Sequence, residues 1–237
     1  MLQTTPSLRV VDVARSLGIA GSTSHRLLTC LKDEGFIRQP SRSRHYVAGP
    51  ELLRLARHFS DQNTLERVAH PHLASLCKEV NEAVNLQILV GSEVLCIDSV
   101  VEDRHSLQVH HIAGQRAVAH VSAAGKLLLS ALKRTELDDL LAHGRQSRPE
   151  EDPVNLTVLH AELEAIRARG YATNMGEREA GVHAVAVPVL DLEGNHVAAV
   201  SVAAPSVRLP HIRIAGLVQH LQVSSAAITA EYFAVFP

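Results

Sequence analysis

Residues 7–47 read SLRVVDVARSLGIAGSTSHRLLTCLKDEGFIRQPSRSRHYV and predict two short helices followed by a basic hairpin. The first helix is indicated by an apolar stripe at helical spacing, formed by Val10, Val13, Ala14 and Leu17. We expect Ser7 to cap its start. Gly18 should end it in the left-handed conformation that glycine enters at little cost.

A second helix is predicted to begin at Ser22, after a tight turn over residues 18–21. We expect it to bury Leu27, Leu28 and Leu31. Its opposite face carries short hydrogen-bonding side chains and one long cation, namely Ser22, His25, Arg26 and Thr29, and no carboxylate precedes Asp33. Such a face suits a recognition helix, because an acidic group there would repel the phosphate backbone.

The hairpin is predicted from Gly35 as a helix stop, two strands at residues 36–38 and 45–47, and Pro40 between them. This order is typical of a winged helix-turn-helix, so double-stranded DNA is the predicted partner. The candidate DNA-contacting residues are Ser22, Thr23, His25, Arg26, Arg38, Arg42, Arg44 and Tyr46. The alternative is a packed helical pair with a solvated basic loop.

The charge distribution favours the DNA-binding interpretation. Residues 1–60 hold nine Lys and Arg against four Asp and Glu, whereas the remaining residues hold fourteen against twenty-one. A basic N-terminal part is therefore joined to an acidic remainder in a chain of net charge −2. Contacts with DNA phosphates require positive charge at the binding surface and not a positive net charge of the whole protein.

The composition narrows the class of protein. A length of 237 residues allows two modest domains or one large one, and no apolar run approaches the roughly 20 residues of a membrane span. We find no export signal, and the three cysteines form no CxxC pair, which argues against a disulfide framework or a cysteine zinc site. We expect a cytoplasmic protein without a cofactor.

The segment after the hairpin is predicted to connect two domains. A helix beginning at Pro50 carries an apolar stripe formed by Leu52, Leu55, Ala56 and Phe59, and the polar residues 60–63 mark a boundary. A further helix begins at Thr64, and we expect Pro71 to bend or break it. The predicted domains are therefore residues 1–49 for DNA binding, a linker helix at 50–63, and residues 64–237 for effector binding and oligomerisation.

The larger part alternates strand and helix patterns. Residues 84–90 predict a half-buried strand, because apolar side chains alternate there with Asn85 and Gln87, and residues 94–100 predict its partner. Leu107, Val109 and His111 are expected on one face of another strand. Helices are predicted at residues 122–132, 135–142, 156–169 and from 210 to about 233, and strands at 182–190 and 196–204. Hairpins with segregated helices indicate an α+β domain built on an antiparallel sheet.

Several segments together resemble the IclR family of bacterial transcription factors. They are residues 12–19 (DVARSLGI), 22–28 (STSHRLL), 46–53 (YVAGPELL), 71–73 (PHL), 122–126 (SAAGK), 181–189 (GVHAVAVPV) and 200–205 (VSVAAP). The resemblance implies a winged helix-turn-helix, a linker helix and a GAF-like effector-binding domain. It also implies a homodimer or homotetramer on a palindromic promoter site. One departure is that only about six residues precede the first predicted helix, where the family has a further helix.

The resemblance also places an effector pocket at the start of the helix predicted from Ser122. Small residues there leave backbone N–H groups approachable, which favours a small organic acid, although they also suit close packing on a sheet. The effector-binding residues that the resemblance implies are Ala123, Ala124, Asn174, Ala184, Ser201 and Ala203. We also expect Ser106 and Val109 to form another wall of the pocket, and His183 is a candidate partner of a ligand carboxylate. Family members that bind small oxo-acids offer more polar groups at the positions of Asn174, Ala184 and Ala203. A larger, less polar acid, such as an aromatic one, is therefore expected.

Other functional classes are less well supported by the sequence. The fifteen histidines include a group formed by His105, His110, His111, His120 and His183, but no metal-binding spacing appears, so no metal site is expected. Gly125-Lys126 lacks the glycine that a phosphate-binding loop needs at His120, and no Gly-x-Ser-x-Gly motif occurs. The remaining alternatives are a ligand-binding interaction protein with impaired DNA binding and, less favoured, a small-molecule enzyme.

Overall fold

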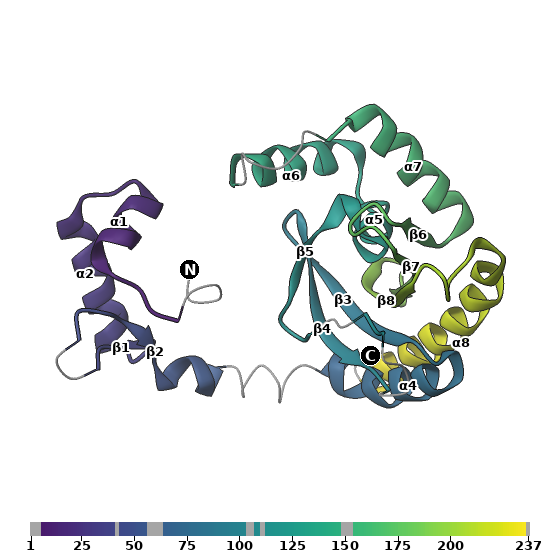
Figure 1. Ribbon diagram of the computed structural model, residues 1–237, viewed down its shortest axis with the longest axis horizontal. Coiled ribbons are helices and arrows are strands. Elements are labelled where there is room, and N and C mark those ends of the chain that lie inside the picture. Colours follow the sequence, from purple (N-terminus) through teal and green to yellow (C-terminus); the bar gives the residue numbers. More distant parts are fainter. Residues whose placement is uncertain are drawn as a thin grey trace. The chain divides into compact units, whose positions relative to one another are not determined.

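The computed structural model describes residues 6–40, 43–55, 64–102, 107–109, 112–147 and 154–235. The chain divides into two compact units, Met1–Thr64 and Leu65–Pro237. Figure 1 shows the smaller unit as helices with a short hairpin and the larger one as a sheet with helices on both faces.

The N-terminal unit contains α1 (Val10–Leu17), α2 (Gly21–Asp33), β1 (Ile37–Arg38) and β2 (Val47–Ala48). Gly18 ends α1 with φ of 63°, as predicted. The expected Ser7 cap is wrong, because Arg9 occupies the N-cap position and no side chain caps the helix. Ser7 lies too far upstream, and its Oγ is 3.3 Å from Nδ1 of His45 on the hairpin.

The core of this unit is small and consists of Leu8, Val13, Leu28, Ile37 and Tyr46. The expected burial of Leu27 and Leu31 is wrong, since these side chains are 46% and 43% exposed. Only one narrow side of α2 packs against α1 and the hairpin, and it carries Ser24 and Leu28, four residues apart. Ser24 donates from Oγ to the carbonyl of Val10 over 2.9 Å and thereby fixes α2 on α1.

The hairpin leads into a helical segment at residues 50–55. Leu52 and Leu55, two members of the predicted apolar stripe, are 39% and 38% exposed. The other two members, Ala56 and Phe59, lie outside the described residues.

The C-terminal unit is built on a six-stranded sheet in the order β5-β4-β3-β8-β7-β6, and each neighbouring pair is antiparallel. The strands are β3 (Ala83–Val90), β4 (Glu93–Val100), β5 (Arg116–Val118), β6 (Ala172–Met175), β7 (Val182–Leu190) and β8 (His196–Pro205). The predicted α+β class is confirmed.

Two edge strands differ from the sequence prediction. Leu107 and Val109 are not in a strand, and Leu107 is 62% exposed, while His111 lies outside the described residues. The edge position next to β4 is taken instead by β5, which was not predicted. The opposite edge strand, β6, was also missed, because three or four residues are too few to show a clear alternation.

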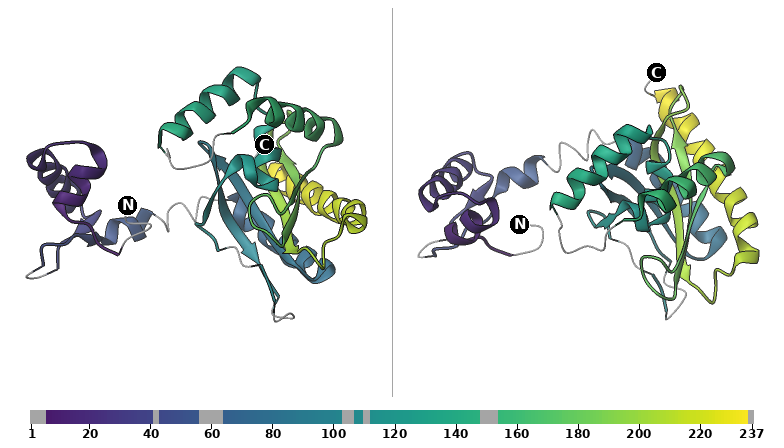
Figure 2. Two further views of the ribbon diagram at one scale, coloured as in Figure 1. Left: turned by 45° about the horizontal axis from the view of Figure 1, so that its top comes forward. Right: turned by 90° about the horizontal axis from the view of Figure 1, so that it is seen from above.

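Helices cover both faces of the sheet (Figures 1 and 2). On one face pack α4 (Thr64–Val80) and α8 (His211–Val235), whose apolar side chains share a core with β3, β7 and β8. On the other lie α5 (Ala123–Leu129), α6 (Arg134–Ser147) and α7 (Leu156–Arg169). The expected break at Pro71 is absent, and α4 continues through this residue.

Strand β3 was predicted to be half-buried, and this prediction is wrong. Val84 and Leu86 contribute to the core under α4 and α8, yet Asn85 and Gln87 on the other face are also buried, at 0% and 5% exposure. The helices on that second face cover the central strands, so polar side chains in β3 are enclosed rather than solvated.

Helix α5 is preceded by a 3-10 turn, Ala119–Val121, and is capped by Ser122, whose Oγ accepts from the N–H of Gly125 over 3.0 Å. A Cβ at Gly125 would lie 2.1 Å from the carbonyl oxygen of Ala119, a distance that no side chain tolerates. Glycine at this position therefore permits the turn to fold back against the helix.

Candidate functional site

The exposed face of α2 carries the residues predicted to contact DNA. Ser22, Thr23, His25 and Arg26 are all exposed, and the first turn contains no acidic residue. Ser24, between them in sequence, points inward. One end of α2 therefore presents three short polar side chains and a guanidinium to the surface.

The hairpin adds basic residues to the same unit. Arg38 and Arg44 are exposed, while Arg42 lies outside the described residues. Tyr46 is 5% exposed and packs in the core with Leu8, so its ring is not available to a duplex and we remove it from the candidate contacts. The backbone of Tyr46 also pairs with that of Leu8, through two hydrogen bonds of 2.8 Å.

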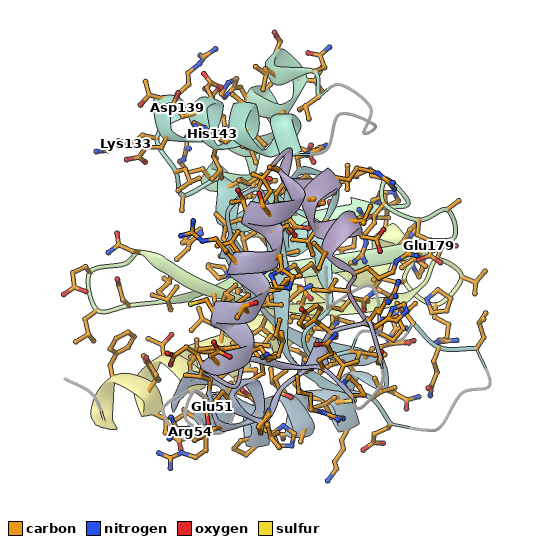
Figure 3. The ribbon with its side chains drawn as sticks, turned by 90° about the vertical axis from the view of Figure 1, so that its left-hand side faces the viewer. Glu51, Arg54, Lys133, Asp139, His143 and Glu179 are labelled. Carbon is orange, nitrogen blue, oxygen red and sulfur yellow. The ribbon has the colours of Figure 1, made fainter. Side chains whose placement is uncertain are left out.

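The base of the hairpin is held by close backbone packing. The N–H of Gly49 donates to the carbonyl of Phe36 over 2.8 Å, and a Cβ on Gly49 would lie 2.1 Å from the carbonyl oxygen of Gly35. Beyond it, Nε of Arg54 donates to Glu51 over 2.7 Å, and Figure 3 shows these two side chains together. Arg54 is therefore already paired within its own helical segment.

A pocket of about 460 Å³, counted to its open mouth, lies in the C-terminal unit. The lining residues are Gln87, Val109, Ser122, Ala123, Ala124, Asn174, Arg178, Glu179, Val182, Ala184, Ser201 and Ala203. The fold thus brings together seven of the residues expected at an effector site, from α5, β6, β7, β8 and residue 109.

Two expected residues are not in the described lining. Ser106 lies outside the described residues. His183 is next to Ala184 in β7, so its side chain points to the other face of the sheet, where Nδ1 is 2.8 Å from the carbonyl oxygen of Leu209. The histidine is thereby bound to the backbone before α8 rather than facing the pocket.

Two polar side chains in the pocket, Ser201 and Asn174, have defined partners. Ser201 donates from Oγ to Oε1 of Gln87 over 2.8 Å. Asn174 donates from Nδ2 to the carbonyl of Val121 and accepts from the N–H of Gly176 over 3.0 Å. Asn174 therefore ties β6 to the turn before α5, and the hydroxyl proton of Ser201 is already engaged.

Sequence reasoning missed five lining residues, Gln87, Ser122, Arg178, Glu179 and Val182. Gln87 was interpreted as the solvent side of a half-buried strand. The exposed residues Arg178 and Glu179 lie in the segment between β6 and β7, and Figure 3 shows Glu179 on this loop. The signal that could have identified Gln87 is its polar side chain in the middle of an otherwise apolar strand.

Lys126 of α5 connects the loop between β6 and β7, which lines the pocket, to helix α7. Its side chain is fully buried, and Nζ donates to Glu162 of α7 over 2.6 Å and also to Glu177. Glu177 immediately precedes Arg178 and Glu179. One buried ammonium group thus joins α5, α7 and the loop that lines the pocket.

The described residues include no group of three side chains suited to hold a metal ion. Burial raises the pKa of the Cys96 thiol to about 11, with a further contribution from the nearby Asp98. This thiol is therefore protonated at neutral pH and is a poor nucleophile. Among the described helices, none has the length and apolar character needed to cross a membrane.

Comparison with known proteins gives consistent matches along most of the chain. The family described as "Bacterial transcriptional regulator IclR C-terminal" matches residues 58–230, and the "IclR helix-turn-helix domain" matches residues 1–41. The HTH-type transcriptional regulator BhcR of Paracoccus denitrificans is 31% identical over 92% of this chain and 78% of its own length.

Solved structures share the fold. An IclR-type regulator from Silicibacter has a TM-score of 0.84 at 24% identity, covering 98% of this chain and 93% of its own. An IclR homologue from Microbacterium hydrocarbonoxydans, crystallised with 4-hydroxybenzoate, has a TM-score of 0.74 at 23% identity, covering 97% and 92%.

Proposed function

The chain belongs to the IclR family of bacterial transcriptional regulators, proteins that bind DNA and respond to small molecules, and we propose a function for each part of it on this basis. We assign DNA binding to residues 1–49, a linker role to residues 50–63, and effector binding with oligomerisation to residues 64–237. It is a regulator and not an enzyme. We place its action in the cytoplasm, where a bacterial promoter lies.

The proposed DNA-contacting residues are Ser22, Thr23, His25 and Arg26 on α2, with Arg38, Arg42 and Arg44 on the hairpin. The support is the exposed polar face of α2, which lacks acidic residues in its first turn, and the positive charge of residues 1–60. Side chains at the start of a recognition helix reach base edges, while hairpin arginines reach phosphates.

The proposed operator is palindromic, and the proposed protein is a homodimer or homotetramer. A single recognition helix covers only a few base pairs, so specific affinity generally requires two half-sites separated by about one helical turn or a multiple of it. The exposed side chains of Leu52 and Leu55 in the helical segment at 50–55 suit a partner helix. They mark the surface where we expect two copies to meet.

The proposed effector is a small organic acid in the pocket beside α5. The side chains of Ala123, Ala124, Ala184 and Ala203 give the pocket an apolar wall of low bulk, which suits the apolar body of an organic acid, for which we propose an aromatic one. The backbone N–H groups of Ala123 and Ala124, in the first turn of α5, have no acceptor within the helix and suit a carboxylate. The pocket lined by these residues is the observation that carries the proposal.

Two measurements test the function. A gel shift with DNA from upstream of its own gene should show a retarded band, competed by excess unlabelled specific DNA but not by random DNA. A thermal-shift screen with aliphatic and aromatic acids, including 4-hydroxybenzoate, should raise the melting temperature, and the active acid should change the gel shift. No stabilisation by any acid, with DNA binding intact, would contradict the organic-acid effector alone.

A further inference from the structure

The pocket contains a buried amide whose donors are unused. Gln87 is 5% exposed and lines the pocket, and its Oε1 accepts from Ser201. Within the part of the chain that the structure describes, Nε2 of Gln87 has no hydrogen-bond partner. This nitrogen is not fully enclosed by protein atoms, so it is accessible from the pocket and can donate to a ligand atom.

The Gln87–Ser201 pair also has a definite polarity. Because the Ser201 proton goes to Gln87, the serine oxygen retains lone pairs, and the neighbouring Nε2 retains two N–H groups. The pair therefore offers the pocket one acceptor and two donors. A hydroxyl group matches this, since its oxygen accepts from Gln87 while its proton is donated to Ser201.

A carboxylate fits the pair less well than a hydroxyl does. It can only accept hydrogen bonds, so it would be attracted to Nε2 but would meet the lone pairs of Ser201. The free backbone N–H groups of Ala123 and Ala124 suit the carboxylate better. The pocket thus has one position for the acid and another for a neutral polar group.

We infer that the effector is a hydroxylated organic acid, in which Gln87 and Ser201 bind the hydroxyl group. This inference rests on the proposed function and adds a chemical class to it. Gln87 is the specificity-determining residue. Ser201 acts both as acceptor and as the positioning residue that holds the amide with its nitrogen toward the ligand.

The test compares acids that differ only in a hydroxyl group. The probes are 4-hydroxybenzoate with benzoate, 4-hydroxyphenylacetate with phenylacetate, and 3-hydroxybutyrate with butyrate. Binding to the full chain is measured by isothermal titration calorimetry, and the readout is the ratio of the two Kd values in each pair. For at least one pair, wild-type protein should bind the hydroxylated acid about three- to tenfold more tightly, as expected for one net hydrogen bond.

Two pocket variants should change that ratio. Gln87→Leu, which keeps the volume and removes both N–H groups, should bring the ratio to about one while the plain acid still binds. Ser201→Ala should lower the preference partly, because the amide loses its orienting partner and the ligand loses an acceptor. If Gln87→Leu does not fold, Gln87→Met replaces it, since methionine has a similar length and no donor.

Two control variants should leave the ratio unchanged. Gln222→Leu makes the same exchange on the exposed surface of α8. Glu179→Gln removes a negative charge from the pocket lining and keeps an acceptor oxygen, so it should affect both acids of a pair equally.

The outcomes separate the two proposals. Equal binding of both acids by wild-type protein, or an unchanged ratio in Gln87→Leu, would overturn the hydroxyl assignment while leaving an acid-responsive regulator intact. Binding of none of the six acids would overturn the hydroxyl assignment and count against the acid effector, whereas the gel shift would still report DNA binding independently.

Discussion

Nζ of Lys126 lies 2.6 Å from Oε1 of Glu162, although Lys126 is fully buried and Glu162 is partly exposed. Glu177 is the second carboxylate at this ammonium group. The pairing places a positive charge where no water can hydrate it, so its stability depends on the two acids. It also links a core helix to the loop carrying Arg178 and Glu179.

Removing both carboxylates should therefore destabilise the C-terminal unit strongly. The double variant Glu162→Gln/Glu177→Gln should lose about 3–5 kcal/mol in urea unfolding, because it leaves an uncompensated buried charge. Each single variant should lose less, since one partner remains. Adding Lys126→Met to the double variant should recover much of the loss, and failure to do so would contradict this explanation.

The two single variants should differ in ligand binding. Glu177→Gln releases the loop that lines the pocket and should weaken binding of an active acid several-fold, whereas Glu162→Gln leaves this loop attached. Calorimetry on the matched pair checks the difference. Equal affinities would mean that the buried lysine supports the fold without shaping the pocket.

Arg26 on α2 and Arg44 on the hairpin should contribute to DNA affinity. Arg26→Ala should weaken operator binding while the melting temperature stays the same, because the side chain is exposed. Arg44→Ala should reduce the slope of log K against log salt by about one if the guanidinium reaches a phosphate. Fluorescence anisotropy over a range of salt concentrations measures both, with Arg213→Ala in α8 as control. Wild-type affinity and slope in both variants would exclude these contacts.

Filling the pocket should abolish the effector response and spare DNA binding. Ala124→Leu adds bulk to the wall at α5, and Ala184→Leu does so from β7, at a less buried position that tolerates the change better. Neither variant should show a thermal shift with an acid that stabilises wild-type protein. Ala226→Leu, on the exposed side of α8, is the matched control. A full response in both pocket variants would place the effector elsewhere.

The protein should be at least a dimer at micromolar concentration. Light scattering should give a mass of two or four chains, and Leu52→Asp or Leu55→Asp should shift it toward the monomer by placing a charge in an apolar contact. Leu53→Asp, on the same helical segment but outside the predicted stripe, should have a smaller effect. A monomeric wild-type protein, with and without DNA, would contradict the proposed oligomer.

His196 should make stability fall in mild acid. Burial lowers the pKa of its imidazole below the usual value of about 6.5. At a pH between the folded and unfolded pKa values, the unfolded chain binds a proton at this histidine more readily than the folded chain does. The stabilising contribution of the neutral, buried His196 is therefore complete above about pH 6.5 and is lost as the pH falls from 6.5 toward the folded pKa. Urea unfolding at pH 7.5 and 5.5 should show a smaller pH difference in His196→Gln than in wild-type protein.

Local sequence signals predicted some elements to the residue and missed others for physical reasons. Helix α7 begins and ends at the predicted residues, because Gly170 supplies the left-handed end. Strand β7 was also predicted correctly, since its apolar run is long. Gln87 was misread because its burial depends on helices that follow it in the chain, and its bond to Ser201 joins residues 114 positions apart. No local pattern contains such a contact.

The contrast between Gly125 and the alanines of the pocket wall has a consequence for how this protein can change. Residue 125 must be glycine, because any Cβ there would collide with the carbonyl oxygen of Ala119. The alanines of the pocket wall are not fixed by such a contact, and single-nucleotide substitutions of an alanine codon reach residues that include glycine, serine, threonine and valine. Ligand preference can therefore drift in small steps of volume and polarity while the helix that presents those side chains stays in place. This makes the pocket a suitable starting point for selecting sensors of new acids, with the promoter-binding unit left untouched.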